Sequence, residues 1–296
     1  MYAAGNGCHA GNSRCYPGAG CWPPLTTTNS LAVDLQLAES VLKPVLRGVT
    51  RCTSQAHLTH SARSGALHGA NLAPAGTGTQ TVADRLTALV PNSSLTHHNH
   101  FLRAGDLSPA GAAWFVVSVR DPVRRLQSGF RSELWAAAQM HGQASMVWAT
   151  PQRTLAAFVR ALRNVSDPSH NAARLVYSRS VAQPEYKGDQ VNAPGSNFLT
   201  AQVDYLRGID CAVGLHFLCV DESLDDDWAR FVRSLGLVPL PGASTHANRR
   251  SGGGNHTTPS TLLDPVDAAF VREQLFPWDA AFHRLACGSN RGIKAR

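Results

Sequence analysis

The chain has 296 residues, of which 43% are hydrophobic, so it is long enough to bury the core of one large domain. Its formal net charge of +7 suits an acidic ligand or polymer. A nucleic-acid binder would cluster its arginines among aromatic residues, whereas here they are scattered, so we expect no nucleic-acid partner. The chain contains no run of about 18 apolar residues, and we therefore expect no membrane span.

The N-terminal part reads differently from the rest of the chain. Residues 1–28 are rich in Gly, Cys, Pro and Asn without periodicity, and a polar stretch to Gly69 follows a helix predicted over residues 30–46. We therefore expect an irregular or disordered extension over residues 1–69 and a domain over residues 70–290. No basic and then apolar signal layout is present, so no targeting segment is visible.

A loop of small residues, Gly76-Thr-Gly-Thr-Gln-Thr81, leads into an amphipathic helix predicted over residues 82–90. Gly and Thr suit a loop whose backbone N–H groups approach a phosphate closely. Pro91 ends that helix, and a histidine cluster follows. Its members are His97, His98 and His100.

The most informative segment is a strand that passes at once into a helix. The apolar, β-branched residues 114–119 predict a strand buried on both faces. Asp121 then offers a helix N-cap, and Pro122 has the φ of a first helical position. Ligands bind beyond the carboxyl ends of parallel strands, where a helix N-terminus favours anions. Arg120 is therefore a candidate phosphate ligand, together with Ser128 about two turns into the helix.

The remaining chain alternates helical patterns with one more strand-like run. Ser223 and the acidic residues after it resemble a capping box, and Gly236 marks the end of that helix. Strands separated by helices pair in parallel, so we expect an α/β fold of three layers, with a central parallel sheet flanked by helices. The predicted helices cover residues 151–164 (with Thr150 as N-cap), 197–207, 224–235 and 262–286, the strand covers residues 215–220, and a loop with several prolines covers residues 167–195.

The seven cysteines include no C-x-x-C pair, so we expect neither a zinc ribbon nor a thioredoxin-like site. Cys211, Cys219 and Cys287 could supply one disulfide in an oxidising compartment. Cys211 and Cys219 are the nearest of these in sequence. Buried free thiols explain the same three residues equally well.

The segment Arg120-Asp-Pro-Val-Arg-Arg-Leu-Gln-Ser128 resembles the 3′-phosphate-binding segment of sulfotransferases that use 3′-phosphoadenosine 5′-phosphosulfate (PAPS). The resemblance implies that Arg120 and Ser128 bind the 3′-phosphate. The loop beginning at Gly76 resembles the 5′-phosphosulfate loop of the same family. It implies that the phosphosulfate is held by Gly76, Thr77, Gly78, Thr79, Gln80 and Thr81.

Later segments resemble Golgi carbohydrate sulfotransferases in the same order, so that the resemblance covers roughly residues 70–287. It implies a P-loop-like form of the three-layer fold, a carbohydrate or polysaccharide acceptor, and a place in the Golgi lumen or secretory pathway. In a basic loop of this group, Arg249 and Arg250 would close over PAPS. The segments are Phe198-Leu-Thr-Ala-Gln-Val-Asp-Tyr-Leu-Arg-Gly208, residues 215–237, His246-Ala-Asn-Arg-Arg250 and Phe276-Pro-Trp-Asp-Ala-Ala-Phe282.

The pair His98-Asn-His100 resembles the His-x-His of heparan sulfate 2-O-sulfotransferase, where the histidines lie at the acceptor hydroxyl. A near-neutral imidazole can take the proton of a sugar hydroxyl as it attacks sulfur, so we expect His98, or else His100, to be the catalytic base. A metal site that includes His97, and solvated loop histidines, are the alternatives. Sulfuryl transfer itself needs no metal, and we expect none.

One position departs from the family pattern. The phosphosulfate loop of the family normally begins with a Lys that stabilises the leaving phosphate, and Gly76 stands there instead, or Ala75 if the loop is aligned one residue earlier. Either Arg63 or Arg85 supplies the charge, or the enzyme is slow or inactive. The sequence thus predicts an in-line, PAPS-dependent sulfotransferase, with a catalytically impaired PAP-, PAPS- or glycan-binding protein of the same fold as the alternative. The loop lacks the Gly-Lys-Ser/Thr of a P-loop kinase.

Overall fold

The structure is a computed structural model of the chain. It describes residues 15–16, 20–21, 35–44, 46–47, 69–72, 74, 76–89, 104, 114–139, 154–181, 201–206, 214–238 and 262–288. In this part of the chain, no helix is both long and apolar enough to cross a membrane.

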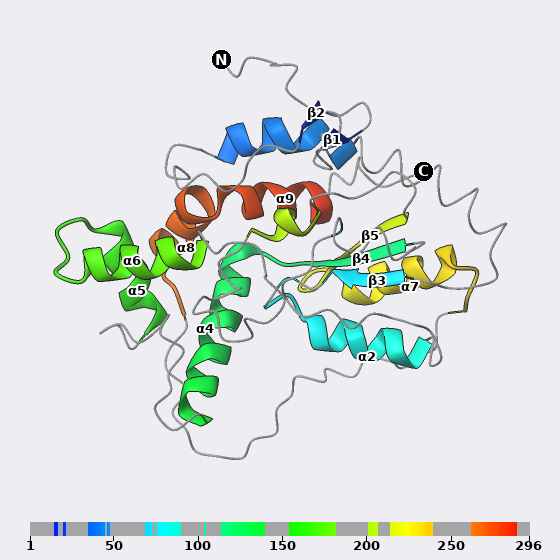
Figure 1. The fold of residues 1–296 in the computed structure, drawn as a ribbon, viewed down its shortest axis with the longest axis horizontal. Coiled ribbons are helices and arrows are strands. Elements are labelled where there is room, and N and C mark those ends of the chain that lie inside the picture. Colours follow the sequence, from blue (N-terminus) through cyan, green and yellow to red (C-terminus); the bar gives the residue numbers. More distant parts are fainter. Residues whose placement is uncertain are drawn as a thin grey trace.

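A sheet of three parallel strands lies at the centre (Figure 1), in the order β3 (Gly69–Leu72), β4 (Trp114–Val119) and β5 (Gly214–Cys219). The register places Val119 beside Cys219, so β4 and β5 end together. The predicted mixed α/β fold with a parallel sheet is confirmed, as are the strands predicted over residues 114–119 and 215–220, the second shifted by one residue. A separate antiparallel pair joins β1 (Cys15–Tyr16) to β2 (Gly20–Cys21).

Helices follow the strands and flank the sheet. The first helix of the described chain, which carries no label, covers residues 35–44 and confirms the helix predicted there. The labelled α-helices are α2 (Thr79–Leu89), α4 (Pro122–Gln139), α5 (Leu155–Arg163), α6 (His170–Val181), α7 (Leu224–Ser234), α8 (Pro265–Phe270) and α9 (Pro277–Cys287), and the shorter turns are η4 (Gln202–Leu206) of 3-10 type and η5 (Val271–Leu275) of π type.

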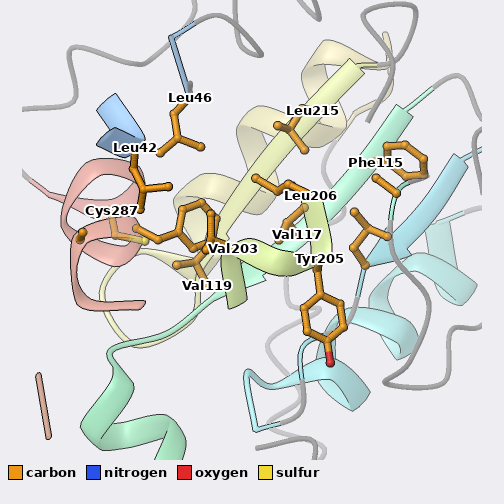
Figure 2. Close-up of a cluster of buried hydrophobic side chains, with 14 of the residues drawn as sticks. Leu42, Leu46, Phe115, Val117, Val119, Val203, Tyr205, Leu206, Leu215 and Cys287 are labelled. Carbon is orange, nitrogen blue, oxygen red and sulfur yellow. The ribbon is translucent and has the colours of Figure 1, made fainter. Parts of the chain in front are cut away.

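Both faces of the sheet carry hydrophobic cores, because alternate residues of β4 point to opposite sides. On one face, Phe115 and Val117 pack with α9, η4 and Leu42 of the helix 35–44 (Figure 2). On the other face, Val116 lies in a cluster with residues of α2 and α7, in which the rings of Trp114 and Phe231 are 5.1 Å apart. The helix 35–44 therefore contributes to the same core as the sheet, although it lies before the domain boundary predicted at residue 69.

A third hydrophobic cluster lies beyond the carboxyl ends of the strands, on the side of α5, α6 and α8 in Figure 1. It packs Leu126 and Phe130 of α4 against Phe158 of α5 and Phe270 of α8. α4 thus begins at the carboxyl edge of the sheet, and its first half, to Phe130, packs against this helical layer.

Some predicted boundaries are wrong. The loop predicted over residues 167–195 contains α6, because the turn at Asp167, whose Oδ1 accepts from Ser169 N at 2.7 Å, starts a helix after Pro168 rather than breaking one. α5 begins at Leu155, with Thr154 in place of Thr150 as its N-cap. Of the helix predicted over residues 197–207, the described part forms only the 3-10 turn η4.

Candidate functional site

Arg120 follows the central strand and joins the ends of all three strands. Its Nε and Nη2 donate to the Asp221 carboxylate, just after β5, at 2.9 and 3.0 Å. Its Nη1 donates to the carbonyl of Gly76, in the loop after β3, at 3.0 Å. A guanidinium matches a carboxylate with two parallel bonds, which fixes the direction of the fork. The carboxyl edge of the sheet is therefore organised around one arginine.

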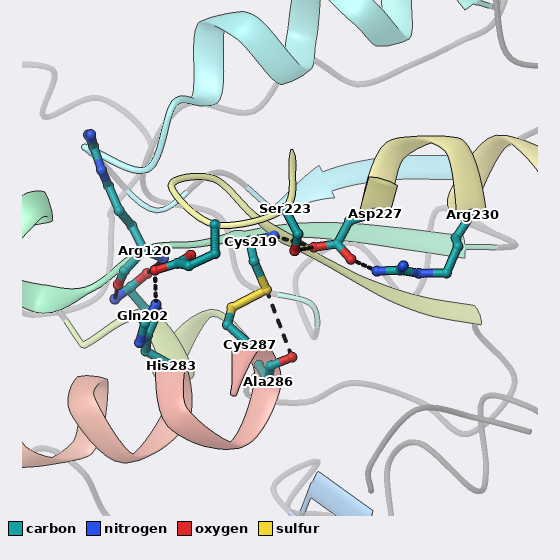
Figure 3. Close-up of a disulfide and its surroundings, with 10 residues drawn as sticks. Arg120, Gln202, Cys219, Ser223, Asp227, Arg230, His283, Ala286 and Cys287 are labelled. Atoms are coloured by element: carbon teal, nitrogen blue, oxygen red, sulfur yellow. Dashed lines mark hydrogen bonds and ion pairs between the residues drawn. A yellow bond between two sulfur atoms is a disulfide. The ribbon is translucent and has the colours of Figure 1, made fainter. Parts of the chain in front are cut away.

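The backbone of Arg120 is held by the buried side chain of Gln202. Arg120 N–H donates to Gln202 Oε1 at 2.9 Å, and Gln202 Nε2 donates to the Arg120 carbonyl at 2.8 Å (Figure 3). The side-chain amide of Gln202 therefore makes the two hydrogen bonds to the Arg120 backbone that a neighbouring strand would otherwise make. Gln202 was not among the predicted site residues, although it is the Gln of the sulfotransferase-like segment 198–208.

A buried ion pair, Arg125–Asp279, holds the backbone of Gln202. Arg125 Nη1 lies 2.8 Å from Asp279 Oδ2, and both side chains are 1% exposed. The other oxygen of Asp279 accepts from Gln202 N at 2.6 Å. Burial raises the pKa of Asp279, while the charge of Arg125 and the Gln202 N–H oppose that shift. These contacts connect α4, α9 and η4 beneath the site.

The loop between β3 and α2 needs glycine at two places. Gly76 and Gly78 have φ angles of +79° and +70°, which L side chains rarely adopt. Between them, the buried Thr77 donates its hydroxyl to the Pro74 carbonyl at 2.6 Å, so that hydroxyl stabilises the loop. α2 then begins at Thr79. The first N–H groups of a helix have no partner within it and favour an anion.

The N-terminus of α4 already holds an anion of its own. Asp121 Oδ1 accepts from the N–H groups of Val123 and Arg124 at 3.0 and 3.2 Å, as the N-cap prediction required. Its other oxygen accepts from Arg272 Nε at 2.8 Å. Burial alone would raise the pKa of Asp121, but the hydrogen bond and charge of Arg272 hold it below the ordinary value. An external phosphate would therefore meet α2 more readily than α4.

Arg85 does not lie free beside the loop. Its Nη2 is 2.5 Å from Asp225 Oδ1, and its guanidinium stacks 5.8 Å from the centre of the Trp228 ring. Both partners belong to α7. The structure thus engages Arg85 in helix packing, which weakens the expectation that it replaces the missing loop lysine.

A His–Glu pair and a disulfide lie near the turn whose Asp221 binds Arg120. His283 Nε2, on α9, is 2.9 Å from Glu222 Oε1. One turn later, Cys287 is bonded to Cys219, at the end of β5. Of the two interpretations of the three C-terminal cysteines, a disulfide and buried free thiols, the structure shows a disulfide, and it does not join the pair nearest in sequence. The end of β5 and the last turn of α9 lie side by side, with Cα atoms 5.7 Å apart, as a disulfide requires.

Ser223 also differs from its prediction. It is the N-cap of α7, but its hydroxyl donates to Asp227 Oδ2 at 2.8 Å and makes no capping bond (Figure 3). The same oxygen accepts from Cys219 N at 2.9 Å. Asp227 therefore holds the β5–α7 turn that carries Asp221 and Glu222.

The structure brings the Gly76–Thr81 loop and Arg120 together, and it places Ser128 half-buried in α4, two turns from Arg120 along the chain. Other predicted residues lie outside the described part of the chain. These are His97, His98 and His100 of the histidine cluster, Arg63, and Arg249 and Arg250 of the basic loop. The side chain of Gln80 also lies outside the described part.

Comparisons with protein-family models, curated proteins and solved structures find no match to the chain. The function must therefore be inferred from the chemistry of the site. The carboxyl edge of the sheet offers a glycine loop at a helix N-terminus and an arginine that, among the described residues, is paired with the carboxylate of Asp221. Such an edge is suited to a phosphate-bearing ligand.

Proposed function

We propose that the chain is a PAPS-dependent sulfotransferase of three-layer, P-loop-like fold, acting on a hydroxyl of a carbohydrate or polysaccharide. One observation carries the proposal. Arg120 Nη1 donates to the Gly76 carbonyl, although the two residues are 44 positions apart. The two segments that resemble the 3′-phosphate and 5′-phosphosulfate sites thus lie in contact at one edge of the sheet, as a single bound PAPS would require.

The charges at this edge support binding of a phosphate. The Arg120 and Asp221 side chains are 21% and 27% exposed, so water and ligands reach the pair. Exposed ion pairs contribute little stability, and a phosphate is an equally good bidentate partner for a guanidinium. In the proposed complex, Asp221 gives way to the 3′-phosphate. Gln202 keeps the Arg120 backbone in place while the fork changes partner.

The proposed reaction is an in-line displacement at sulfur. A bond forms between the acceptor oxygen and sulfur while the bond from sulfur to the bridging oxygen breaks, leaving 3′,5′-diphosphoadenosine. The acceptor proton goes to a base, for which we propose His98, or else His100. The α2 N-terminus stabilises charge on the departing phosphate, and Arg249 or Arg250 closes over the nucleotide.

A second function is favoured by two observations. Gly76 stands where the family has lysine, and Arg85 is paired with Asp225. A protein of this kind would bind PAP or PAPS, or a glycan, without turning over. The two functions differ in one readout, because both predict nucleotide binding but only the enzyme transfers labelled sulfate from PAPS to an acceptor.

The first experiment is calorimetric binding of 3′,5′-diphosphoadenosine, compared with AMP and ATP, at moderate salt. Wild type should prefer the ligand with a 3′-phosphate, and Arg120→Ala should lose that preference. Arg174→Ala, which removes an exposed arginine from the distant α6, is the charge-matched control and should bind as wild type does. Equal binding of AMP and 3′,5′-diphosphoadenosine by wild type would refute both proposed functions that use the nucleotide.

A further inference from the structure

Four possible metal ligands meet where β5 and α9 end. The ligand atoms of Glu222, His283 and Cys287 all lie within 4.8 Å of one another. Cys219 belongs to the same group because its sulfur is bonded to that of Cys287. His283 and Cys287 are four residues apart on α9 and so share one face of the helix. Glu222 follows Cys219 by three residues in the adjoining turn.

The chemistry of this group depends on the disulfide. In the oxidised form, the two sulfurs are bonded to each other, and only an imidazole and a carboxylate are left to hold a metal. In the reduced form, two thiolates join them. Two thiolates, one imidazole and one carboxylate make a four-coordinate donor set that suits Zn²⁺.

We propose that reduction of the Cys219–Cys287 disulfide creates a Zn²⁺ site with Cys219, Cys287, His283 and Glu222 as ligands. A dithiol supplies two electrons and two protons: the disulfide becomes two thiols, and the dithiol becomes a disulfide. Zn²⁺ then displaces both thiol protons to solvent. The metal and the disulfide use the same sulfurs, so each excludes the other. None of these four residues has a role in the proposed PAPS site.

Small movements are enough to form the site. Zinc–sulfur bonds of about 2.3 Å in a tetrahedron place two sulfurs about 3.8 Å apart. The Cα atoms of the two cysteines, 5.7 Å apart, allow this through side-chain rotation. On the other side, zinc would replace the contact of 2.9 Å between His283 and Glu222 with two bonds of about 2.0–2.2 Å.

The surroundings suit a metal that enters from one side. Both cysteines are buried, whereas the His283 and Glu222 side chains are 19% and 40% exposed and face solvent. The neighbouring cations, Arg120 and Arg272, are each paired with a carboxylate of their own. They would therefore repel the metal less than free cations would.

The test titrates Co²⁺, a spectroscopic substitute for Zn²⁺, into the full chain. One sample is oxidised, and the other is reduced with a dithiol that is then removed without oxygen. The reduced chain should bind one equivalent, with thiolate-to-cobalt absorption and the visible bands of a tetrahedral ion, and Zn²⁺ should abolish both. The oxidised chain should show neither. No difference between the two samples would overturn the proposal.

Variants separate this site from cysteines elsewhere in the chain. His283→Ala and Glu222→Ala keep both cysteines, and each should weaken Co²⁺ binding at least tenfold in the reduced chain. Glu273→Ala, which removes an exposed carboxylate from η5, is the control and should have no effect. Cys219→Ser with Cys287→Ser gives the background absorption. Unchanged affinity in both ligand variants would contradict the assignment.

Folding is followed by circular dichroism in the same samples. If reduction unfolds the chain, stoichiometric Zn²⁺ should restore the native spectrum, because a structural metal site contributes its binding free energy to folding. A reduced chain that stays unfolded with Zn²⁺ present would also overturn the proposal.

Discussion

Asp221 binds the Arg120 guanidinium through both of its carboxylate oxygens, with its nearest contact at 2.9 Å. The pair joins the residue that follows β4 to the turn that follows β5. It also means that the arginine proposed to bind a phosphate is occupied by a carboxylate in the absence of ligand.

Asp221→Asn should therefore tighten the binding of 3′,5′-diphosphoadenosine several-fold. The amide keeps the shape of the side chain but no longer competes with phosphate for the guanidinium. Glu273→Gln makes the same change of charge on η5 and should leave the affinity unchanged. Calorimetry measures both. Weaker binding in Asp221→Asn would show instead that the carboxylate positions Arg120 for its ligand.

Asp121→Asn should lower the free energy of unfolding at pH 7 by about 1 kcal/mol, because it removes the charge facing Arg272 but keeps a capping oxygen. The pKa of Asp121 is lowered from its ordinary value of 3.8 in the folded chain. Its contribution is therefore present above about pH 4 and is lost as the pH falls through the lowered pKa. Asp121→Asn should therefore lose less free energy of unfolding than wild type does when the pH is lowered.

Urea denaturation between pH 7 and pH 2.5 measures this effect. Asp121→Ala is the companion variant, because it removes the cap as well as the charge and should be less stable than Asp121→Asn at pH 7. If wild type and Asp121→Asn lost stability in parallel below pH 4, the ion pair with Arg272 would not be the cause of the shift.

Gly78→Ala should be more destabilising than Gly236→Ala. Both glycines have positive φ, of +70° and +75°, and an added side chain costs about 1–2 kcal/mol in that conformation. At Gly78 an added Cβ would also lie 2.9 Å from Val220 Cγ1, whereas at Gly236 it meets nothing within 4 Å. Urea denaturation gives both values. Equal costs would mean that Val220 moves aside freely.

Asp279→Ala should destabilise the chain by about 3–5 kcal/mol, because it removes the carboxylate that lies 2.8 Å from the buried guanidinium of Arg125. Glu39→Ala breaks the ion pair of Arg284 with Glu39, whose side chains are 60% and 26% exposed, and should cost no more than about 1 kcal/mol. Thermal and urea unfolding compare the two. Similar losses would show that burial does not decide the value of the Arg125 pair.

Local sequence patterns were enough to predict the elements that form the edge of the site. The apolar run 114–119 is β4, and the Asp-Pro pair after it starts α4 with the expected cap. Both predictions depend only on residues adjacent in sequence: the strand on the apolar residues that its two buried faces require, and the helix start on the fixed φ of proline. The prediction of a loop over residues 167–195 is wrong because local sequence does not distinguish a proline that precedes a helix, as Pro168 does, from a proline that interrupts one.

The sequence by itself thus determined where the central strand ends and which arginine stands there. Only the tertiary structure decided what that arginine touches: Asp221 and Gln202 are 101 and 82 positions away. It likewise paired Cys219 with Cys287, 68 residues on, rather than with the nearer Cys211. The reason is geometric, because parallel pairing brings the carboxyl ends of strands distant in sequence to one edge, and a residue carries no local sign of its partner there.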